Sequence, residues 1–529
     1  MNNLHIETLD TTLRDGMQGE GITFSVEDKL ALCRILDRLG ITYIEGGVAG
    51  ANPKDDEFFR RAKTELDLKN SILTAFGSTR RKNTVASEDT GVLALADAGT
   101  KAVTIFGKCW KLHVAEILNT TPDENLNMIY DTISYLVNCG KEVIFDAEHF
   151  FDGYKNDPEY ALSTLKSAAN AGASILVLCD TNGGTFCDEI YQIASDVVNL
   201  FPDTRIGIHC HNDSGMATAS STLAVKAGAT HIQGTFLGIG ERCGNAQLST
   251  IIPGLQLKKG YRLLPDDSIK NLTSAAREIA EICNISIKKY EPYIGTSAFA
   301  HKAGMHTDAV LKNPVSFEHI PPESVGSERR FLMSEIAGRG AVLVKAGSIL
   351  RNIDKNSPEA DLIIEKVKEM EGHGYQYEGA ESSFELLVKR CTGQYHPYFE
   401  LINYKTIEES PYEEFSTTAT IKIKVGDRVQ LSAAEGHGPV HALDKALRSA
   451  IEIFYPCLKG IKLIDYKVRV MDSNAATAAK VRVLISSTDG KKIWTTVGCS
   501  NDIIEASWIA LVDSIEYKLS LEEGISPLN

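Results

Sequence analysis

The feature that most constrains the fold is a regular alternation of short apolar runs with amphipathic stretches over roughly the first 260 residues. The apolar runs recur at intervals of roughly thirty residues, the length of one βα unit. They begin near Leu4, Tyr43, Ile72, Ala102, Glu142, Ser174, Arg205 and His231. A helical pattern follows each run, for example from Val26 to Leu39 and from Glu159 to Ala171. Eight such units predict a closed (β/α)8 TIM barrel. The alternative is an open, doubly wound sheet, which usually has fewer units and a dinucleotide-binding loop after its first strand; the sequence has no such loop.

Polar residues gather where the predicted strands end. Arg14 and Asp15 follow the first strand, and the eighth strand leads into Gly240-Glu241-Arg242-Cys243-Gly244-Asn245. Other strand ends carry Glu45, Asp146 with Glu148, Asp180-Thr181-Asn182 and His209-Cys210-His211. Catalytic residues of TIM barrels come from the carboxyl ends of several strands. The distribution therefore predicts one active site at that end of the barrel.

The two histidines at the end of the seventh strand carry the sharpest chemical prediction. Residues i and i+2 of a strand point to the same face, so His209 and His211 can bind one ion together. Asp15 would complete a set of two histidines and one carboxylate, with open positions for a chelating substrate. Arg14 beside it can polarise a carbonyl group. Taken alone, the histidines could instead form a hydrogen-bonded pair in a loop, and Arg14 with Asp15 a surface salt bridge.

The periodic pattern breaks between about residues 262 and 395. A helical run from Ser268 to Cys283 is followed by His301 and His306, and then by segments interrupted by Pro314 and Pro321-Pro322. This punctuation predicts small subdomains rather than a core. Each histidine, taken by itself, is compatible with an ordinary surface or capping residue.

The last segment, from about residue 396, is predicted to be a separate α+β domain with an internal repeat. A strand around Val429 leads through Gly436-His437-Gly438-Pro439 to a helix bearing Ala442 and Ala446. About sixty residues later, a strand around Ile493 leads through Gly498 to a helix bearing Ala506 and Ala510. Small residues at i and i+4 allow two helices to pack closely. The predicted domains are a barrel (1–265), linker subdomains (266–395) and a C-terminal binding and association domain (396–529).

Charge and cysteine content narrow the class of protein. The net charge of −15 argues against a general nucleic-acid or anionic-membrane surface, so a small-molecule partner is expected. The eleven cysteines are scattered without a Cys-x-x-Cys pair, as expected for reduced thiols in a cytosol. The N-terminus runs into a strand without a basic-then-apolar leader, and no apolar run approaches the roughly twenty residues of a membrane span. A cytoplasmic location without membrane association is expected.

Several longer motifs resemble a known family, the metal-dependent acyl-CoA condensing barrels that include isopropylmalate, homocitrate and citramalate synthases. The shared segments are Asp10-Thr-Thr-Leu-Arg-Asp-Gly-Met-Gln18, His209-Cys-His-Asn-Asp213 and Gly238-Ile-Gly-Glu-Arg-Cys-Gly-Asn245. With the C-terminal repeat, they span nearly the whole chain. Further segments are similar to the longer type of (R)-citramalate synthases: Ala75-Phe-Gly-Ser-Thr-Arg-Arg-Lys82, Phe145-Asp-Ala-Glu-His-Phe-Phe-Asp-Gly-Tyr154 and Leu178-Cys-Asp-Thr-Asn-Gly-Gly184.

The resemblance implies an acyltransferase that condenses acetyl-CoA with pyruvate, releasing (R)-citramalate and coenzyme A for isoleucine biosynthesis. It implies a divalent ion, Zn, Mn or Mg, held by Asp15, His209 and His211 with Asn245 near the metal. Arg14 would stabilise the alkoxide that forms on the oxoacid, where a fixed positive charge lowers the barrier most. Thr181 would donate a hydrogen bond to the oxoacid carboxylate.

The resemblance also implies how acetyl-CoA is handled. The thioester methyl group has a pKa far above neutral, so a positioned base is required. His306 is the implied base or relay, reaching the neighbouring subunit's barrel, and Glu148 is implied to orient the acetyl group. The Arg80-Arg81-Lys82 segment could contact coenzyme phosphates, and a solvated loop is the alternative for the same residues.

Departures from the family pattern leave other functions open. Val48-Ala49 stands where the longer citramalate synthases usually have Trp-Pro, and Phe317 stands where a tyrosine is common. Isopropylmalate or homocitrate synthase activity and a carbon–carbon lyase on the same barrel are therefore alternatives. A non-catalytic amino-acid sensor is a third hypothesis. By resemblance, the C-terminal domain implies a homodimer and an isoleucine effector site.

Overall fold

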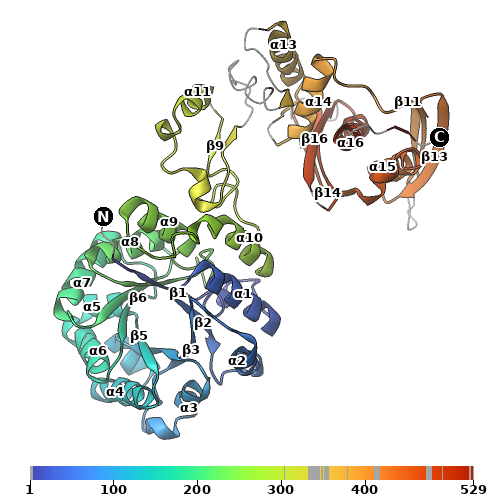
Figure 1. Ribbon diagram of the computed structural model, residues 1–529. Coiled ribbons are helices and arrows are strands. Elements are labelled where there is room, and N and C mark those ends of the chain that lie inside the picture. Colours follow the sequence, from blue (N-terminus) through green and yellow to red (C-terminus); the bar gives the residue numbers. More distant parts are fainter. Residues whose placement is uncertain are drawn as a thin grey trace. The chain divides into compact units, whose positions relative to one another are not determined.

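The computed structural model describes residues 4–302, 304–331, 346, 349–350, 357–377, 379–409, 417–471, 479–490, 492–522 and 526–527. The chain forms two compact units (Figure 1). The first consists of residues 1–299 with 319–329, and the second of residues 300–318 with 330–529.

The first unit is a closed barrel of eight parallel strands, as predicted. The strands are β1 (Glu7–Asp10), β2 (Tyr43–Val48), β3 (Ile72–Ser78), β4 (Ala102–Lys108), β5 (Glu142–Glu148), β6 (Ile175–Asp180), β7 (Arg205–Cys210) and β8 (His231–Gly234). Pairing of β1 with β8 closes the barrel, with Asp10 beside Gly234. Strand β1 begins later than the apolar run near Leu4, because His5 pairs with Arg262 in an isolated bridge instead. The open-sheet alternative is wrong.

Helices surround the barrel (Figure 1). They are α1 (Val26–Leu39), α2 (Pro53–Glu65), α3 (Thr90–Asp97), α4 (Pro122–Asn138), α5 (Phe150–Asn156), α6 (Pro158–Asn170), α7 (Cys187–Leu200), α8 (Ala217–Ala227) and α9 (Leu248–Lys259). Helix α1 has the predicted bounds because Ser25 and Asp28 form a capping box and Gly40 ends it in a left-handed conformation. The predicted Ser268–Cys283 run begins as a 3-10 turn and continues as α10 (Leu272–Ile282).

The barrel has an inner and an outer apolar layer, which follow from the alternation of side chains along each strand. In β6, Ile175 and Val177 belong to a small cluster with residues of other strands, including Leu9 and Ile144. Their neighbours Leu176 and Leu178 belong to the large cluster shared with the surrounding helices. The strands are therefore packed on both faces, inside the barrel and against the helices.

A buried ion pair fixes the loop after β2. The Lys29 ammonium is fully buried, lies 2.5 Å from Asp55 Oδ1 and donates to the Gly46 carbonyl at 2.8 Å. Asp55 Oδ2 accepts from the backbone N–H of Val48 at 3.2 Å. The conformation of the Val48-Ala49 segment is thus set by partners outside the site.

The second unit begins with small elements. Strands β9 (Ala300–His301) and β10 (Arg330–Phe331) pair in parallel. Helix α11 (Gly304–Lys312) is followed by the 3-10 turn η5 (Pro314–Ser316), and α13 (Pro358–Gly372) by α14 (Glu381–Cys391). The boundaries predicted at residues 265 and 395 stay predictions.

The C-terminal part of the second unit contains the predicted repeat. Strands β11 (Glu400–Glu408), β12 (Thr417–Val425) and β13 (Arg428–Gly436) form one antiparallel sheet, followed by α15 (Pro439–Ile451). Strands β14 (Lys462–Val470), β15 (Val481–Thr488) and β16 (Ile493–Ser500) form the second, followed by α16 (Ile503–Ser520). The register shifts after Leu401 in one sheet and after Leu463 in the other. Helices α15 and α16 contact each other, with Ala442, Ala446, Ala506 and Ala510 fully buried, which confirms the repeated strand-loop-helix pattern.

Candidate active site at the carboxyl end of the barrel

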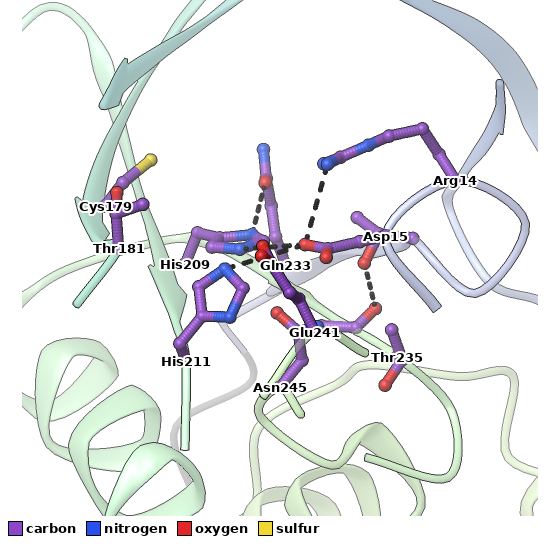
Figure 2. Close-up of polar contacts among 12 residues, drawn as sticks. Arg14, Asp15, Cys179, Thr181, His209, His211, Gln233, Thr235, Glu241 and Asn245 are labelled. Atoms are coloured by element: carbon purple, nitrogen blue, oxygen red, sulfur yellow. Dashed lines mark hydrogen bonds and ion pairs between the residues drawn. The ribbon is translucent and has the colours of Figure 1, made fainter. Parts of the chain in front are cut away.

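The site centres on a cluster of one carboxylate and two imidazoles. Asp15 follows β1, His209 lies in β7 and His211 follows it, and all three side chains are buried. Asp15 Oδ2 lies 3.3 Å from His209 Nε2 and 3.9 Å from His211 Nε2. Figure 2 shows these side chains converging on one point. The predicted juxtaposition of the three residues is therefore present.

Several polar atoms of this cluster are buried without a partner among the described residues. They are Asp15 Oδ1, His211 Nδ1 and Asn245 Oδ1. A buried polar group left unpaired costs about 1–3 kcal/mol, which coordination of a cation by the oxygens would offset. Asn245 lies beside His211, since their backbones form an isolated bridge. The donor set of carboxylate, amide and imidazole groups thus fits a divalent metal with open positions.

Asn245 is placed by a loop that requires glycine. Gly244 has φ of 84°, and a Cβ added there would lie 2.0 Å from the Gly238 carbonyl oxygen. The Asn245 amide nitrogen donates to the Ile239 carbonyl at 3.2 Å, which fixes the orientation of its side chain. The Gly238–Asn245 motif therefore folds back on itself to bring one amide to the metal cluster.

His209 is oriented by a chain of hydrogen bonds. Gln233, from β8, uses its amide nitrogen to donate to Asp146 Oδ1 at 2.8 Å. Its carbonyl oxygen then accepts from His209 Nδ1 at 3.0 Å. This network places the lone pair of the neutral imidazole on Nε2, the nitrogen that faces Asp15.

The protonation states follow from burial and nearby charge. Burial alone would raise the pKa of the Asp15 carboxyl, but Arg14, His209 and His211 hold it well below its usual range. Burial and the neighbouring His209 lower the pKa of His211 to about 4, so its imidazole is neutral near pH 7. Burial also lowers the pKa of His209, but Asp15 outweighs it and the net shift is upward. A bound cation therefore competes with a proton at His209.

Arg14 is held rigidly beside the cluster. Its Nε donates to Glu45 Oε2 at 2.6 Å, and its guanidinium carbon lies 3.9 Å from the centre of the Phe76 ring. One terminal nitrogen lies 3.7 Å from Asp15 Oδ2. Burial raises the pKa of Glu45, while burial and the Glu45 charge raise the pKa of Asp146 to about 7. The guanidinium is thus the fixed positive charge among several buried carboxyl groups.

Two of the cavities in the described part of the barrel share a lining residue, Phe106. The first, of about 240 Å³, contains the cluster and is lined by Arg14, Asp15, Gln18, Phe76, Phe106, Asp146, Glu148, Cys179, Thr181, His209, His211, Glu241 and Arg242. The second, of about 470 Å³, includes Phe106 and Lys108 with apolar residues such as Ile117 and Met128. Phe106 lines both cavities, so they adjoin.

Thr181 and Glu148 both line the first cavity, as the sequence predicted for a common site. Thr181 Oγ1 accepts from the backbone N–H of His149 at 2.9 Å, which leaves its hydroxyl hydrogen available to a substrate. His149 has φ of 55°, in the left-handed region that non-glycine residues rarely adopt. Glu148 forms an ion pair with Lys108 across β4 and β5.

The Arg80-Arg81-Lys82 segment lines the second cavity, but its three cations differ. Arg80 is buried and bound to Glu124 at 2.8 Å and Asp131 at 2.7 Å. Arg81 and Lys82 are exposed. Within this segment, the accessible positive charge therefore lies on Arg81 and Lys82.

His306 lies on α11, in the second unit, and is exposed. Its ring stacks on Phe317 with centroids 4.1 Å apart, so the phenylalanine that departs from the family pattern is its direct neighbour. His301 instead pairs with Glu318 at 3.1 Å. The assignment of His306 as a base stays a prediction.

Sequence reasoning missed several residues of this site. Glu45 and Asp146 were visible as acids at strand ends, but their contacts with Arg14 and Gln233 were not. Gln233 and Lys108 belong to no recognised motif. Only their position near the ends of β8 and β4 could have indicated that they belong to the site. Arg242 belongs to a motif that the sequence analysis identified, but the sequence did not predict its contacts. Arg242 donates two hydrogen bonds to Asp213, at 2.8 and 3.0 Å, and one to the Thr181 carbonyl at 2.7 Å.

Family comparisons cover most of the chain. Residues 5–280 match the HMGL-like family, residues 293–374 match a homocitrate synthase post-HMGL domain-like family and residues 378–519 match the LeuA allosteric (dimerisation) domain. These matches follow the succession of barrel, linker elements and repeat.

Individual relatives align over nearly the full length. The chain is 53% identical to an (R)-citramalate synthase of Aquifex aeolicus, over 98% of both chains, and 47% identical to one of Geobacter sulfurreducens, also over 98% of both. A 2-isopropylmalate synthase of Aquifex aeolicus is 28% identical, over 98% of this chain and 96% of its own. Among solved structures, an HMG-CoA lyase of Bacillus subtilis is similar with a TM-score of 0.46 and 20% identity, over 54% of this chain and 95% of its own.

Proposed function

This chain belongs to the (R)-citramalate synthase family of HMGL-like enzymes, and from that premise we propose that it condenses acetyl-CoA with pyruvate to give (R)-citramalate and coenzyme A. The observation that carries the proposal is the 53% identity to a curated (R)-citramalate synthase over 98% of both chains. The buried Asp15–His209–His211 cluster supports it, because a non-catalytic sensor has no need of a metal-binding cavity. The enzyme is a transferase acting on two small molecules.

Asp15, His209 and His211 would hold the divalent ion, with Asn245 as a neighbouring oxygen donor. The ion supplies Lewis-acid polarisation of the oxoacid carbonyl group. Gln233 keeps His209 in the tautomer that can bind it. The single fixed orientation of His209 favours a preformed site over one assembled on binding.

Arg14 and Thr181 would act on the oxoacid itself. The guanidinium of Arg14 is fixed by Glu45 and Phe76, so it can stabilise the negative charge that develops on the keto oxygen without reorganising. The hydroxyl of Thr181, whose oxygen already accepts from His149, can donate to the oxoacid carboxylate. Both residues line the first cavity.

Acetyl-CoA would approach through the second cavity. Its apolar walls suit a pantetheine arm, and the exposed Arg81 and Lys82 suit coenzyme phosphates. Arg80 supports that segment structurally, because Glu124 and Asp131 already neutralise its charge. Glu148 would orient the acetyl group and His306 would take the methyl proton.

The substrate assignment is tested by a panel of oxoacids. Coenzyme A release from acetyl-CoA is measured with pyruvate, 2-oxobutyrate, 2-oxoisovalerate and 2-oxoglutarate, and pyruvate is expected to give the highest kcat/KM. The Val48-Ala49 departure does not oppose this, since neither residue lines the first cavity; Ala49 donates to the Phe76 carbonyl at 3.2 Å. A higher kcat/KM for 2-oxoisovalerate or 2-oxoglutarate would instead indicate isopropylmalate or homocitrate synthase activity.

The proposal extends to assembly and location. The match to an allosteric dimerisation domain supports a homodimer, and Ile407, Leu431 and Val470 expose apolar surface on the strands of the repeat.

We propose a cytoplasmic enzyme of isoleucine biosynthesis. All eleven cysteines are free thiols, which supports the cytoplasmic location. Among the helices that the structure describes, none is long and apolar enough to cross a membrane. The three-domain division at residues 265 and 395 remains part of this proposal.

Isoleucine is proposed as the feedback effector, bound by the C-terminal repeat. An effector changes activity only through different affinity for active and inactive arrangements, typically a coupling of about 1–3 kcal/mol. Removing the chain after residue 395 is therefore expected to abolish inhibition by isoleucine, with some loss of activity. Initial rates at increasing isoleucine, with leucine as the control, test this. A full-length enzyme indifferent to isoleucine, or equal inhibition of both forms, would leave the repeat as a dimerisation unit only.

A further inference from the structure

Lys108 lies at the boundary between the two cavities. It ends β4, opposite Glu148 at the end of β5, and the two side chains form an ion pair. Lys108 lines the second cavity, Glu148 lines the first, and Phe106, which lines both, lies 5.5 Å from the Lys108 ammonium. The pair therefore joins a residue that lines the second cavity to one that lines the first.

The chemistry of Glu148 alone does not explain how it could orient an acetyl thioester. An ionised carboxylate only accepts hydrogen bonds, and the thioester has no N–H or O–H group to donate. A donor must therefore stand between the carboxylate and the thioester carbonyl oxygen. The cation that the structure places beside Glu148 is the Lys108 ammonium, whose N–H groups can donate to more than one acceptor.

The arginines of the first cavity are already engaged. Arg14 is bound to Glu45 and stacked on Phe76, beside the place of the oxoacid. Arg242 makes two hydrogen bonds to Asp213 and one to the Thr181 carbonyl. Among the residues that the structure describes, the Lys108 ammonium has one ion-pair partner, Glu148, and its side chain is 15% exposed, so it has further N–H groups to offer a ligand.

We propose that Lys108 is a catalytic residue, whose ammonium donates a hydrogen bond to the thioester carbonyl oxygen of acetyl-CoA and stabilises the enolate. The inference rests on the proposed condensation and deepens it. Glu148 then acts as a positioning residue that holds Lys108 at the cavity boundary.

The step balances with the groups already named. The methyl C–H bond breaks, and its proton passes to the imidazole of His306. The C–H electron pair forms the carbon–carbon double bond, and the carbonyl π pair moves to the oxygen held by Lys108. The enolate carbon then attacks the keto carbon of the oxoacid, so that the C=C pair forms the new C–C bond and the oxygen pair re-forms the thioester carbonyl. The keto π pair moves to the keto oxygen beside Arg14, and this oxygen takes the proton from the imidazolium to become a hydroxyl group. Water then attacks the thioester carbon and the C–S bond breaks; one water proton goes to the sulfur of the departing coenzyme A and the other is released from the new carboxyl group.

The test is Lys108→Gln in the full-length, metal-loaded enzyme, assayed with acetyl-CoA and with acetyl-CoA deuterated at the methyl group. Exchange of the ammonium for a neutral amide removes the positive charge beside the developing oxyanion and is expected to lower kcat about 10²- to 10³-fold. Because deprotonation becomes slower, the deuterium isotope effect on kcat should rise, whereas metal content and the oxoacid KM should be unchanged. Lys108→Arg, which keeps a positively charged donor, should recover part of the rate.

Lys111→Gln is the matched control, since Lys111 lies at the same end of the barrel and pairs with Asp157. It is expected to retain the native rate and isotope effect. A Lys108→Gln rate within about threefold of native, a loss without a rise in the isotope effect, or an arginine variant no faster than the glutamine variant would overturn the inference. Absence of citramalate from pyruvate with native enzyme would contradict the proposed function as well, so the two failures are distinguishable.

Discussion

Replacing His209 by alanine is expected to remove most of the bound divalent ion and to lower turnover at least about a hundredfold, while the barrel stays folded. His211→Ala should behave in the same way. Each change deletes one imidazole from a cluster whose ligand atoms lie within 4.8 Å of one another. Metal content by mass spectrometry, and Mn²⁺ or Zn²⁺ titration of the metal-stripped protein, would be measured beside kcat.

Two variants make this prediction discriminating. Gln233→Leu removes the hydrogen bond that orients His209, together with the one to Asp146, and leaves the ligands themselves in place, so a smaller loss of metal affinity, about 10- to 100-fold, is expected. His113→Ala removes a histidine outside the cluster and should leave metal content unchanged. Full metal content and rate in either ligand variant would show that the ligand assignment is wrong.

The second large effect is expected for Arg14→Lys, which should lower kcat about 10²- to 10³-fold with little change in the oxoacid KM. The charge that Arg14 neutralises develops mainly in the transition state, so its loss affects the chemical step more than ground-state binding. A lysine keeps the charge, but it cannot both bind Glu45 through Nε and present terminal nitrogens to the cavity. Steady-state kinetics over a range of pyruvate concentrations separate kcat from KM.

Glu45→Gln is the companion variant for Arg14. It keeps a hydrogen-bond acceptor but weakens the ion pair that fixes the guanidinium, so a smaller fall in kcat is expected than for Arg14→Lys. Metal content should stay native in both, because neither residue belongs to the ligand cluster. An increase in the oxoacid KM with kcat unchanged would identify Arg14 as a substrate-binding residue only.

The barrel and the candidate metal cluster were predictable because their signals are local in the sequence. The strand-helix period is read directly from the order of apolar residues, and α1 has the predicted bounds because its caps are also local. His209 and His211 share a face because alternate residues of any strand do. The repeat was readable for the same reason, since each strand-loop-helix unit carries its own pattern.

Contacts between distant segments were decided only by the tertiary structure. Gln233 can donate to and accept from the site because the register of β7 and β8 places it beside His209. Lys108 contacts Glu148 because the register of β4 and β5 places these two residues opposite each other. The sequence predicts Arg80 to be a ligand-binding cation because it lies in a basic segment. In the structure, its charge is neutralised by Glu124 and Asp131, two residues of the neighbouring helix α4. The sequence by itself determined the barrel, the end at which the candidate site lies and the grouping of Asp15 with His209 and His211. Which charges remain available to a substrate depended on the barrel register and helix packing, because a side chain's partners are set by spatial neighbours that no local pattern encodes.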